Sequence, residues 1–190
     1  MRRTTRTLIL GMILARMAAT PLLSQTTQQY TIGNVDVVGS KQLSTNVVKS
    51  ILGLVPGAAY DRVQLRNGFM NLNRIYASVG YLNLTATPVE NIDEQKKVVN
   101  LTINLDEDRQ FFVRRITFTG NTTTSDDLIR RELLVKEGQV FNATALDLSL
   151  SRLNQLGYFE EIRSGDVSIK LSATEPVLDI NVVVKEKERK

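Results

Sequence analysis

The chain of 190 residues contains no cysteine and no histidine. Without cysteine it can form neither a disulfide framework nor a thiolate metal site, and it has no thiol nucleophile. Without histidine it lacks the commonest general base and the commonest metal ligand. The composition therefore points away from catalysis, and we predict neither a metal site nor a cofactor.

Acidic residues are missing from the first 35 positions, and this absence accounts for the formal net charge of +4. Four arginines, at positions 2, 3, 6 and 16, lie in that stretch, and beyond residue 24 the chain has 20 basic residues against 20 acidic ones. A protein that neutralises nucleic-acid phosphates keeps a basic surplus in its folded part. The sequence therefore predicts no nucleic-acid partner.

Residues 1–24 have the pattern of a secretory signal peptide. Arginines come first, an apolar run over residues 8–15 follows, and small residues then offer cleavage sites. The apolar run is much shorter than the roughly 20 residues that span a bilayer. We expect a signal peptide over residues 1–24 and a polar spacer over residues 25–29.

The most informative pattern is an internal repeat with an offset of 81 residues. The offset later shortens by four residues, which is about one helical turn and leaves an apolar helix face where it was. A period of this length indicates one folding unit used in tandem. The identical pairs are Gly39/Gly120, Ser44/Ser125, Gly57/Gly138, Leu65/Leu146, Leu72/Leu153 and Asn73/Asn154, followed by Gly80-Tyr81/Gly157-Tyr158.

The first unit has strand and helix signals in the order β-α-α-β-β. A strand is predicted over residues 30–38, a short helix after Ser44, and a turn at Pro56-Gly57. Asp61 is expected to cap a longer helix that Gly80 ends, and strands are predicted over residues 81–89 and 99–105. The apolar stripe of the longer helix is Leu65, Phe69, Leu72, Tyr76 and Val79.

The second unit repeats this order. A strand is predicted over residues 111–119, and Thr124 with Asp127 resembles a capping box before a helix that carries Leu133 and Leu134. Asn142 is expected to cap the longer helix, which Gly157 ends. Strands are then predicted over residues 159–171, with a possible break at Gly165, and over residues 178–184. The core stripe of the longer helix is Leu146, Leu150, Leu153 and Leu156.

The fold class is therefore α+β, with two tandem β-α-α-β-β domains, each a three-stranded mixed sheet with two helices on one face. The predicted domains span residues 30–106 and 111–190, and residues 107–110 form a short linker. Because the linker has no Pro/Gly/Ser-rich run, we expect limited hinge motion rather than independent tumbling.

This repeat resembles the polypeptide-transport-associated (POTRA) domain, with a glycine after the first strand and Gly-Tyr after the second helix. The second unit is similar to the barrel-proximal POTRA domain of BamA-type outer-membrane protein assembly factors. The segments that carry this likeness are residues 113–121, 130–132, 137–138, 152–160 and 184–189. In that family a membrane barrel follows the last segment, whereas this sequence stops at Lys190.

The resemblance implies a periplasmic, non-enzymatic module at the inner face of the outer membrane. Its partners would be unfolded outer-membrane proteins, assembly-machine lipoproteins, and a membrane barrel if the gene continues beyond Lys190. An alternative is a POTRA-type structural interaction protein of a secretion or cell-division system, which takes no part in barrel insertion. Continuation of the reading frame into a barrel would favour the first hypothesis.

An exposed sheet edge is the feature expected to carry binding, because an extended peptide can add a strand to it. The topology of similar domains points to the strand after the second helix of each unit. The first of these edges is polar but uncharged, whereas Glu160, Glu161 and Arg163 guard the second. The predicted peptide-binding residues are Tyr81, Leu82, Asn83, Leu84, Thr85, Ala86 and Thr87.

The resemblance also implies that Arg130 and Glu137 contact a lipoprotein partner. Two acidic pairs, Asp126-Asp127 and Glu160-Glu161, invite comparison with catalytic carboxylates. The first pair suits a helix N-terminus, and the second is expected on a strand with its side chains on opposite faces. Neither pair has a partner base in the sequence pattern, so no catalytic residue is predicted.

Overall fold

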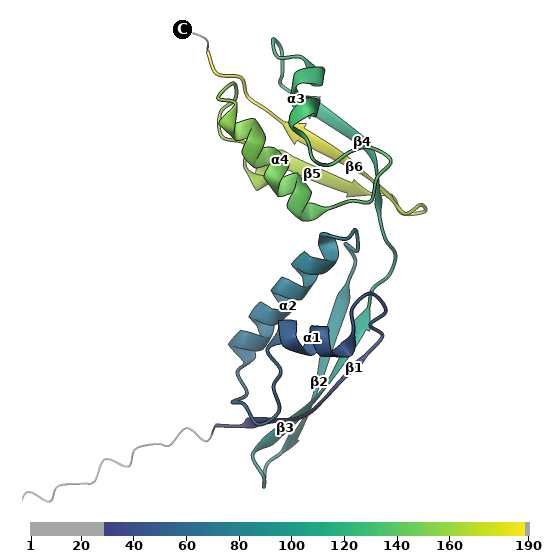
Figure 1. The fold of residues 1–190 in the computed structure, drawn as a ribbon, viewed down its shortest axis with the longest axis vertical. Coiled ribbons are helices and arrows are strands. Elements are labelled where there is room, and N and C mark those ends of the chain that lie inside the picture. Colours follow the sequence, from purple (N-terminus) through teal and green to yellow (C-terminus); the bar gives the residue numbers. More distant parts are fainter. Residues whose placement is uncertain (1–28, 189–190) are drawn as a thin grey trace, which may run out of the picture.

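The computed structural model describes residues 29–188, which form two β-α-α-β-β units joined end to end (Figure 1). The predicted signal peptide, and all of the predicted spacer except Gln29, lie outside the described residues. The first unit comprises β1 (Thr31–Val38), α1 (Thr45–Leu52), α2 (Arg62–Ala77), β2 (Thr85–Asp93) and β3 (Val98–Asp106). The second comprises β4 (Phe112–Thr119), α3 (Asp126–Glu132), α4 (Ala143–Gln155), the 3-10 turn η1 (Ser164–Asp166), β5 (Val167–Leu171) and β6 (Val177–Val183).

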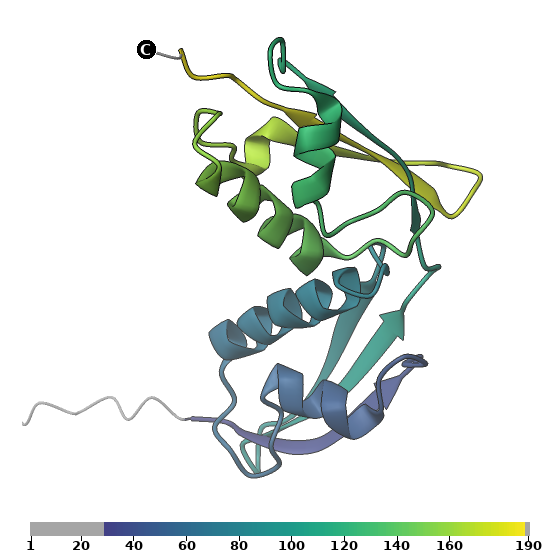
Figure 2. The same cartoon turned by 45° about the horizontal axis from the view of Figure 1, so that its top comes forward.

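Each unit has one three-stranded mixed sheet whose last strand lies in the middle. The strand orders are β1-β3-β2 and β4-β6-β5, and the central strand pairs parallel on one side and antiparallel on the other. The two helices of each unit cover one face of its sheet and leave the other face open (Figures 1 and 2). The predicted α+β class with two such units is confirmed.

Each unit has its own hydrophobic core between sheet and helices. In β3 the buried residues alternate with partly exposed ones, as expected for a central strand with one covered face. The predicted helix stripes supply the other side of each core, except that Val79 lies beyond the end of α2 and is exposed. The fully buried large side chains are Leu52, Leu72, Tyr76, Leu101 and Ile103 in the first unit, and Phe111, Ile129, Phe141, Leu153, Phe159, Leu178 and Ile180 in the second.

The two longer helices begin where the sequence predicts. The Asp61 carboxylate accepts hydrogen bonds from the backbone N–H groups of Val63 and Gln64, at 2.7 and 3.3 Å. Asn142 Oδ1 accepts one from the N–H of Ala145 at 2.8 Å. These side chains satisfy N–H groups that have no partner within the first turn of a helix.

The two shorter helices begin without a side-chain cap. Ser44 and Ser125 occupy the N-cap positions, but neither side chain makes a capping hydrogen bond. The predicted capping box of Thr124 and Asp127 is therefore wrong, because the N–H of Thr124 is bound instead by a distant carboxylate. The helix α3 also ends at Glu132, so the predicted helical positions Leu133 and Leu134 lie in the following loop.

The two units touch at the end of α2 and the beginning of β4. The N–H of Phe111 donates to the carbonyl oxygen of Gly80 at 2.8 Å, and Gln110 Nε2 donates to that of Val79 at 2.9 Å. Leu82, from the segment after α2, packs against the core of the second unit. The first unit thus contributes both backbone acceptors and an apolar side chain to the surface of the second.

Candidate functional site: the edges of the two sheets

The strand β2 is an outer strand along its whole length. It pairs with β3 from Thr85 opposite Asp106 to Asp93 opposite Val98, and no strand of the described residues pairs with its other side. All nine of its residues are exposed or partly exposed. An uncovered edge of this length presents backbone groups to an extended partner.

The structure corrects the predicted start of this edge strand, because residues 81–84 precede β2. Tyr81 packs edge-on against Tyr76, with ring centroids 6.1 Å apart. Leu82 packs on the second core, and Leu84 is buried in the first. Asn83 Nδ2 donates to the carboxylate of Asp108 at 2.8 Å.

The rest of the predicted peptide-binding set lies on β2. Thr85, Ala86 and Thr87 are its first three residues. Four of the seven predicted residues therefore support the corner between α2 and β2, and three belong to the edge itself. The edge continues beyond the predicted set as far as Asp93.

Pro88 shows which backbone groups of β2 face outward. Proline has no N–H for the ladder, and in a sheet it sits on an edge strand with its nitrogen away from the neighbour. Successive residues of an antiparallel strand alternate between the two sides. Ala86, Glu90 and Ile92 therefore also face outward with Pro88, and three N–H donors remain on the free edge with a gap at Pro88.

A pocket of about 270 Å³ lies at the end of this edge, and we call it the tyrosine pocket. Its wall contains two tyrosine hydroxyls that are engaged by neighbouring carboxylates. Tyr60 donates to Glu90, and Arg62 pairs with the same carboxylate at 2.7 Å. Hydrogen bonds from Tyr60 and Arg62 hold the pKa of Glu90 below its usual value. The pocket is lined by Tyr30, Tyr60, Arg62, Ile92 and Val99.

The corresponding edge of the second unit is shorter. The strand predicted over residues 159–171 is confirmed only from Val167 onward, where β5 begins, and its possible break at Gly165 falls in the 3-10 turn Ser164–Asp166. Phe159 makes only an isolated bridge, with Glu186. The predicted guard residues lie before β5, where Glu160 pairs with Lys185 and Glu161 with Arg163, each at 2.8 Å. Glu160 and Glu161 therefore do not lie on a strand. The exposed edge of five residues offers fewer backbone groups than β2.

The outer strand β4 is covered on its free side by chain from its own unit. The N–H of Val113 donates to the carbonyl of Gln139 at 2.8 Å, and the N–H of Gly138 donates back to the carbonyl of Val113 at 2.7 Å. Phe112 and Val140 form an isolated bridge in the same region. This segment closes the first half of the β4 edge.

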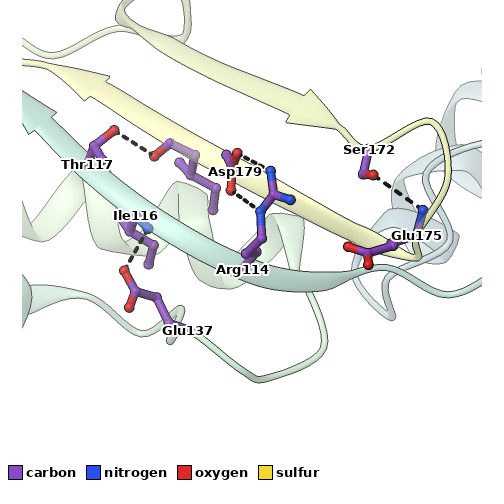
Figure 3. Close-up of polar contacts among 8 residues, drawn as sticks. Arg114, Ile116, Thr117, Glu137, Ser172, Glu175 and Asp179 are labelled. Carbon is purple, nitrogen blue, oxygen red and sulfur yellow. Dashed lines mark hydrogen bonds and ion pairs between the residues drawn. The ribbon is translucent and has the colours of Figure 1, made fainter.

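Arg130 and Glu137 close the next part of the same edge. Glu137 Oε1 accepts a hydrogen bond from the backbone N–H of Ile116 at 2.7 Å, and Arg130 Nη2 donates to the carbonyl of Ile116 at 2.6 Å. The two side chains also pair with each other at 3.2 Å. Figure 3 shows the Glu137 carboxylate directed at the backbone nitrogen of Ile116, and Arg114 forming a two-pronged pair with Asp179 on the same sheet.

The pair remains accessible although it is tied to the strand. The side chains of Arg130 and Glu137 are 38% and 42% exposed. The hydrogen bond from Ile116, together with the charge of Arg130, holds the pKa of Glu137 below its usual value despite some desolvation. Beside them lies a pocket of about 220 Å³, lined also by Ile116, Leu133, Val135 and Lys136. A partner here would meet a fixed ion pair next to apolar wall.

Sequence reasoning missed two glutamates that hold equivalent loops. Glu107 accepts from the N–H groups of Lys41 and Gln42 at 2.8 and 3.1 Å. Glu186 accepts from the N–H of Thr124 at 2.6 Å, from the hydroxyl of Thr122, and from both the N–H and the hydroxyl of Thr123. The two glutamates lie 79 residues apart in the repeat. Glu107 directly follows β3, and Glu186 lies three residues after β6. A comparison of the two repeats could therefore have identified both glutamates from the sequence.

The described residues contain no group of acidic side chains placed to hold a metal ion. Asp126 and Asp127 lie in the first turn of α3, as their sequence position suggests. Across residues 29–188, none of the helices has the length and apolar character needed to cross a membrane.

Comparison with known proteins finds a family that shares this architecture. The POTRA model, described as surface antigen variable number repeat, matches residues 30–108 and again residues 111–187. The outer membrane protein assembly factor BamA of Buchnera aphidicola is 29% identical over 136 residues, which make up 72% of this chain and 22% of that protein. The chain thus spans about a fifth of the length of the first curated relatives that it matches.

Solved structures of BamA have a fold similar to that of this chain. BamA from Haemophilus ducreyi lacking POTRA domains 1–3 superposes with a TM-score of 0.69 at 26% identity, over 83% of this chain and 30% of that chain. POTRA domains 3–5 of Haemophilus influenzae BamA superpose with a TM-score of 0.67 over 83% of this chain and 61% of that chain. The second likeness, at 23% identity, bears on the fold alone.

Proposed function

The chain belongs to the POTRA family, and on that premise we propose that it is the periplasmic module of an outer-membrane protein assembly factor of the BamA type. In this role it binds unfolded outer-membrane proteins by strand addition and docks assembly partners. The free nine-residue edge of β2 is the observation that carries the proposal.

Strand addition suits this client class because main-chain hydrogen bonds demand little sequence. An extended segment would pair with the outward N–H groups of Ala86, Glu90 and Ile92. It would also pair with the carbonyls of the outward-facing residues of β2. The other edges are less available, since β5 is short, β4 is covered, and the start of β1 is paired through Ile32 with Gly57 and Ala58. The segment that binds would therefore be Thr85–Asp93, which includes Thr85, Ala86 and Thr87 of the predicted set and extends it.

The relatives support the setting of this module. Relatives that the chain matches are named as outer membrane protein assembly factors. A signal peptide over residues 1–24 would deliver the chain to the periplasm, at the inner face of the outer membrane. A membrane barrel and assembly-machine lipoproteins are the further partners we propose. The same relatives do not favour the alternative of a secretion or cell-division protein.

Strand addition can be tested by NMR on the isotope-labelled chain, titrated with an unfolded outer-membrane β-barrel protein diluted from urea. We expect the amide signals of Ala86, Glu90 and Ile92 to shift. The variant Ala86→Pro removes one outward donor in the way that Pro88 already does, and it should weaken binding. Thr87→Ala, which leaves the backbone unchanged, is the control. Unchanged binding by a folded Ala86→Pro variant, with shifts confined to other strands, would contradict the proposal.

Docking of a lipoprotein at Arg130 and Glu137 is a second proposed interaction. The fixed ion pair beside the 220 Å³ pocket supports it, because an acidic and a basic group with apolar wall between them can orient a partner. Since Glu137 also binds Ile116, its loss has a structural component that a test must separate.

Two substitutions make that separation. Glu137→Gln keeps an acceptor for the Ile116 N–H and loses the charge, whereas Glu137→Lys loses both. If the charge binds the partner, capture of the lipoprotein falls in both variants, while the melting temperature falls clearly only in Glu137→Lys. Capture that follows the melting temperature in both variants would show that Glu137 acts only on the fold.

A further inference from the structure

We propose that the tyrosine pocket receives one large apolar side chain of the segment that adds to β2, and so selects the register of that segment. The inference rests on the proposed strand addition and names the part of the client that is recognised. The client is an extended segment with an aromatic or leucine-sized residue at one position. Ile92 belongs both to the β2 edge and to the pocket, so the pocket opens where an added strand would lie.

Sheet geometry directs such a side chain to the pocket. Ile92 pairs with Val99, which is fully buried and faces the helices. Directly paired residues point to the same face of a sheet, and neighbours along a strand point to opposite faces. A residue added opposite Ile92 therefore projects its side chain on the helix-covered side, beside Tyr60 and Arg62.

The chemistry of the wall favours an apolar guest. Ile92 and Val99 are aliphatic, and both tyrosine hydroxyls are already bound, Tyr30 to Glu94 at 2.5 Å and Tyr60 to Glu90. What remains for a guest is ring surface and aliphatic surface. An aromatic side chain that meets another ring edge-to-face or offset gains binding free energy beyond that of burying its surface. A volume of about 270 Å³ lies just below the range of pockets for drug-sized ligands, and it suits one side chain.

The second unit has apolar residues at the equivalent positions. Counted through the repeat, Tyr30 and Tyr60 correspond to Phe111 and Phe141. Those phenylalanines are fully buried in a core against which Leu82 of the first unit packs, and Phe111 donates its N–H to Gly80. A leucine side chain from a neighbouring segment thus already packs on the core that contains these two phenylalanines.

The tyrosines in this pocket suit a side chain that binds transiently rather than one that is permanently packed. In the second unit, where both positions are fully buried, phenylalanine stands at both, whereas the first unit has tyrosine, which can face water through its hydroxyl. Tyr30 and Tyr60 are only partly buried, and Glu90, Glu94 and Arg62 provide polar partners at the rim. A pocket that stays wettable when empty suits clients that bind and leave.

The test uses synthetic nine-residue peptides of alternating threonine and valine, with phenylalanine, leucine, alanine or lysine at the central position. Affinity for the full chain is measured by fluorescence anisotropy. We expect the phenylalanine and leucine peptides to bind about tenfold more tightly than the alanine peptide, and the lysine peptide no better than alanine, because one side chain in a pocket discriminates by about this factor.

Two substitutions on the same strand locate the effect. Ile92→Trp fills the pocket and should bring the phenylalanine peptide to the affinity of the alanine peptide. Val89→Trp is the matched control, since Val89 is exposed and lies on the opposite face of β2, and it should leave the preference intact.

The outcomes separate the two proposals. If all four peptides bind equally to the unaltered chain, or if Ile92→Trp leaves the preference unchanged, the pocket has no role and strand addition stands. If none of the peptides binds and an unfolded client also fails to shift β2, strand addition itself is wrong. Formation of a complex between copies of the chain that Ile92→Trp abolishes would assign the pocket to a second copy and overturn this inference.

Discussion

At the scale of single residues, the units are held by a few groups that bind the backbone. Glu107 and Glu186 each collect hydrogen bonds from the loop after the first strand, and Glu107 also accepts from the hydroxyl of Tyr76 at 2.7 Å. Desolvation raises the pKa of Tyr76, and the nearby Glu107 adds to the shift, to about 12. Each glutamate ties the chain just after the last strand of its unit to the loop between the first strand and the first helix.

Glu186 makes stability depend on pH. Desolvation alone would raise its pKa, but hydrogen bonds from Thr122, Thr123 and Thr124 outweigh this effect and hold the pKa well below the usual value of 4.5. A carboxylate with a depressed folded pKa contributes stability above its unfolded pKa and loses that contribution as the pH falls. The melting temperature of Glu186→Gln should therefore lie below that of the unaltered chain at pH 7.

The difference should shrink as the pH falls from about 5 towards 2, because the carboxylate of the unfolded chain takes up a proton in that window while the folded carboxylate, with its lowered pKa, stays ionised. The exposed Glu188→Gln is the control and should follow the unaltered chain. A difference between Glu186→Gln and the unaltered chain that does not change with pH would show that the charge of Glu186 is irrelevant.

Two glycines with similar backbone angles should respond differently to substitution. Gly120 has φ +98°, and an added Cβ would lie 2.0 Å from the carbonyl oxygen of Val184, whereas Gly138 has φ +80° and open space around it. Gly138→Ala should lower the free energy of unfolding, measured in urea, by about 1 kcal/mol, because the only cost is that alanine must adopt the left-handed conformation. Gly120→Ala should cost about 3 kcal/mol or more, because the strand end must move as well. Equal costs would show that the contact at Val184 relaxes freely.

At the scale of elements, the sequence predicts what local chemistry decides. The caps at Asp61 and Asn142 and the buried stripes of α2 and α4 follow from residue type and helical spacing. The start of β2 does not, because residues 81–84 alternate like a strand but are held at the corner by Tyr76 and the second core. The closure of the β4 edge by Glu137 and Arg130 likewise depends on contacts across the fold.

The difference between capped and uncapped helices can be measured. Asp61→Ala removes the acceptor for two N–H groups at the start of α2 and should cost about 1 kcal/mol of unfolding free energy. Ser44→Ala at the start of α1 should change stability by no more than a few tenths, because the Ser44 side chain makes no capping bond. Chemical denaturation of both variants tests this, and a larger loss for Ser44→Ala would contradict the assignment of the caps.

At the scale of the whole molecule, the junction decides how the two sheets are presented. The linker is not a spacer between independent bodies, because Gln110 and Phe111 donate to carbonyls at the end of α2. Gly80, with φ +88°, lies against Val140 and Gln110, and a Cβ there would meet Val140 at 2.8 Å. The β2 edge and the Arg130–Glu137 pair are thus held at a set spacing, which suits a module that handles a client and a partner together.

Leu82 is the apolar element of this junction, and its truncation should loosen it. Leu82→Ala removes the side chain that the first unit packs on the second core, while each unit keeps its own buried cluster. Spin labels on cysteines introduced at the exposed positions Arg66 and Asp147 would be the only thiols in the chain. Electron–electron distance measurements should give one narrow distribution in the parent and a broader one in Leu82→Ala.

Val89→Ala, a truncation at an exposed strand position, should leave the distribution narrow. An equally narrow distribution in Leu82→Ala would mean that the backbone bonds of Phe111 and Gln110 fix the two units without help from packing.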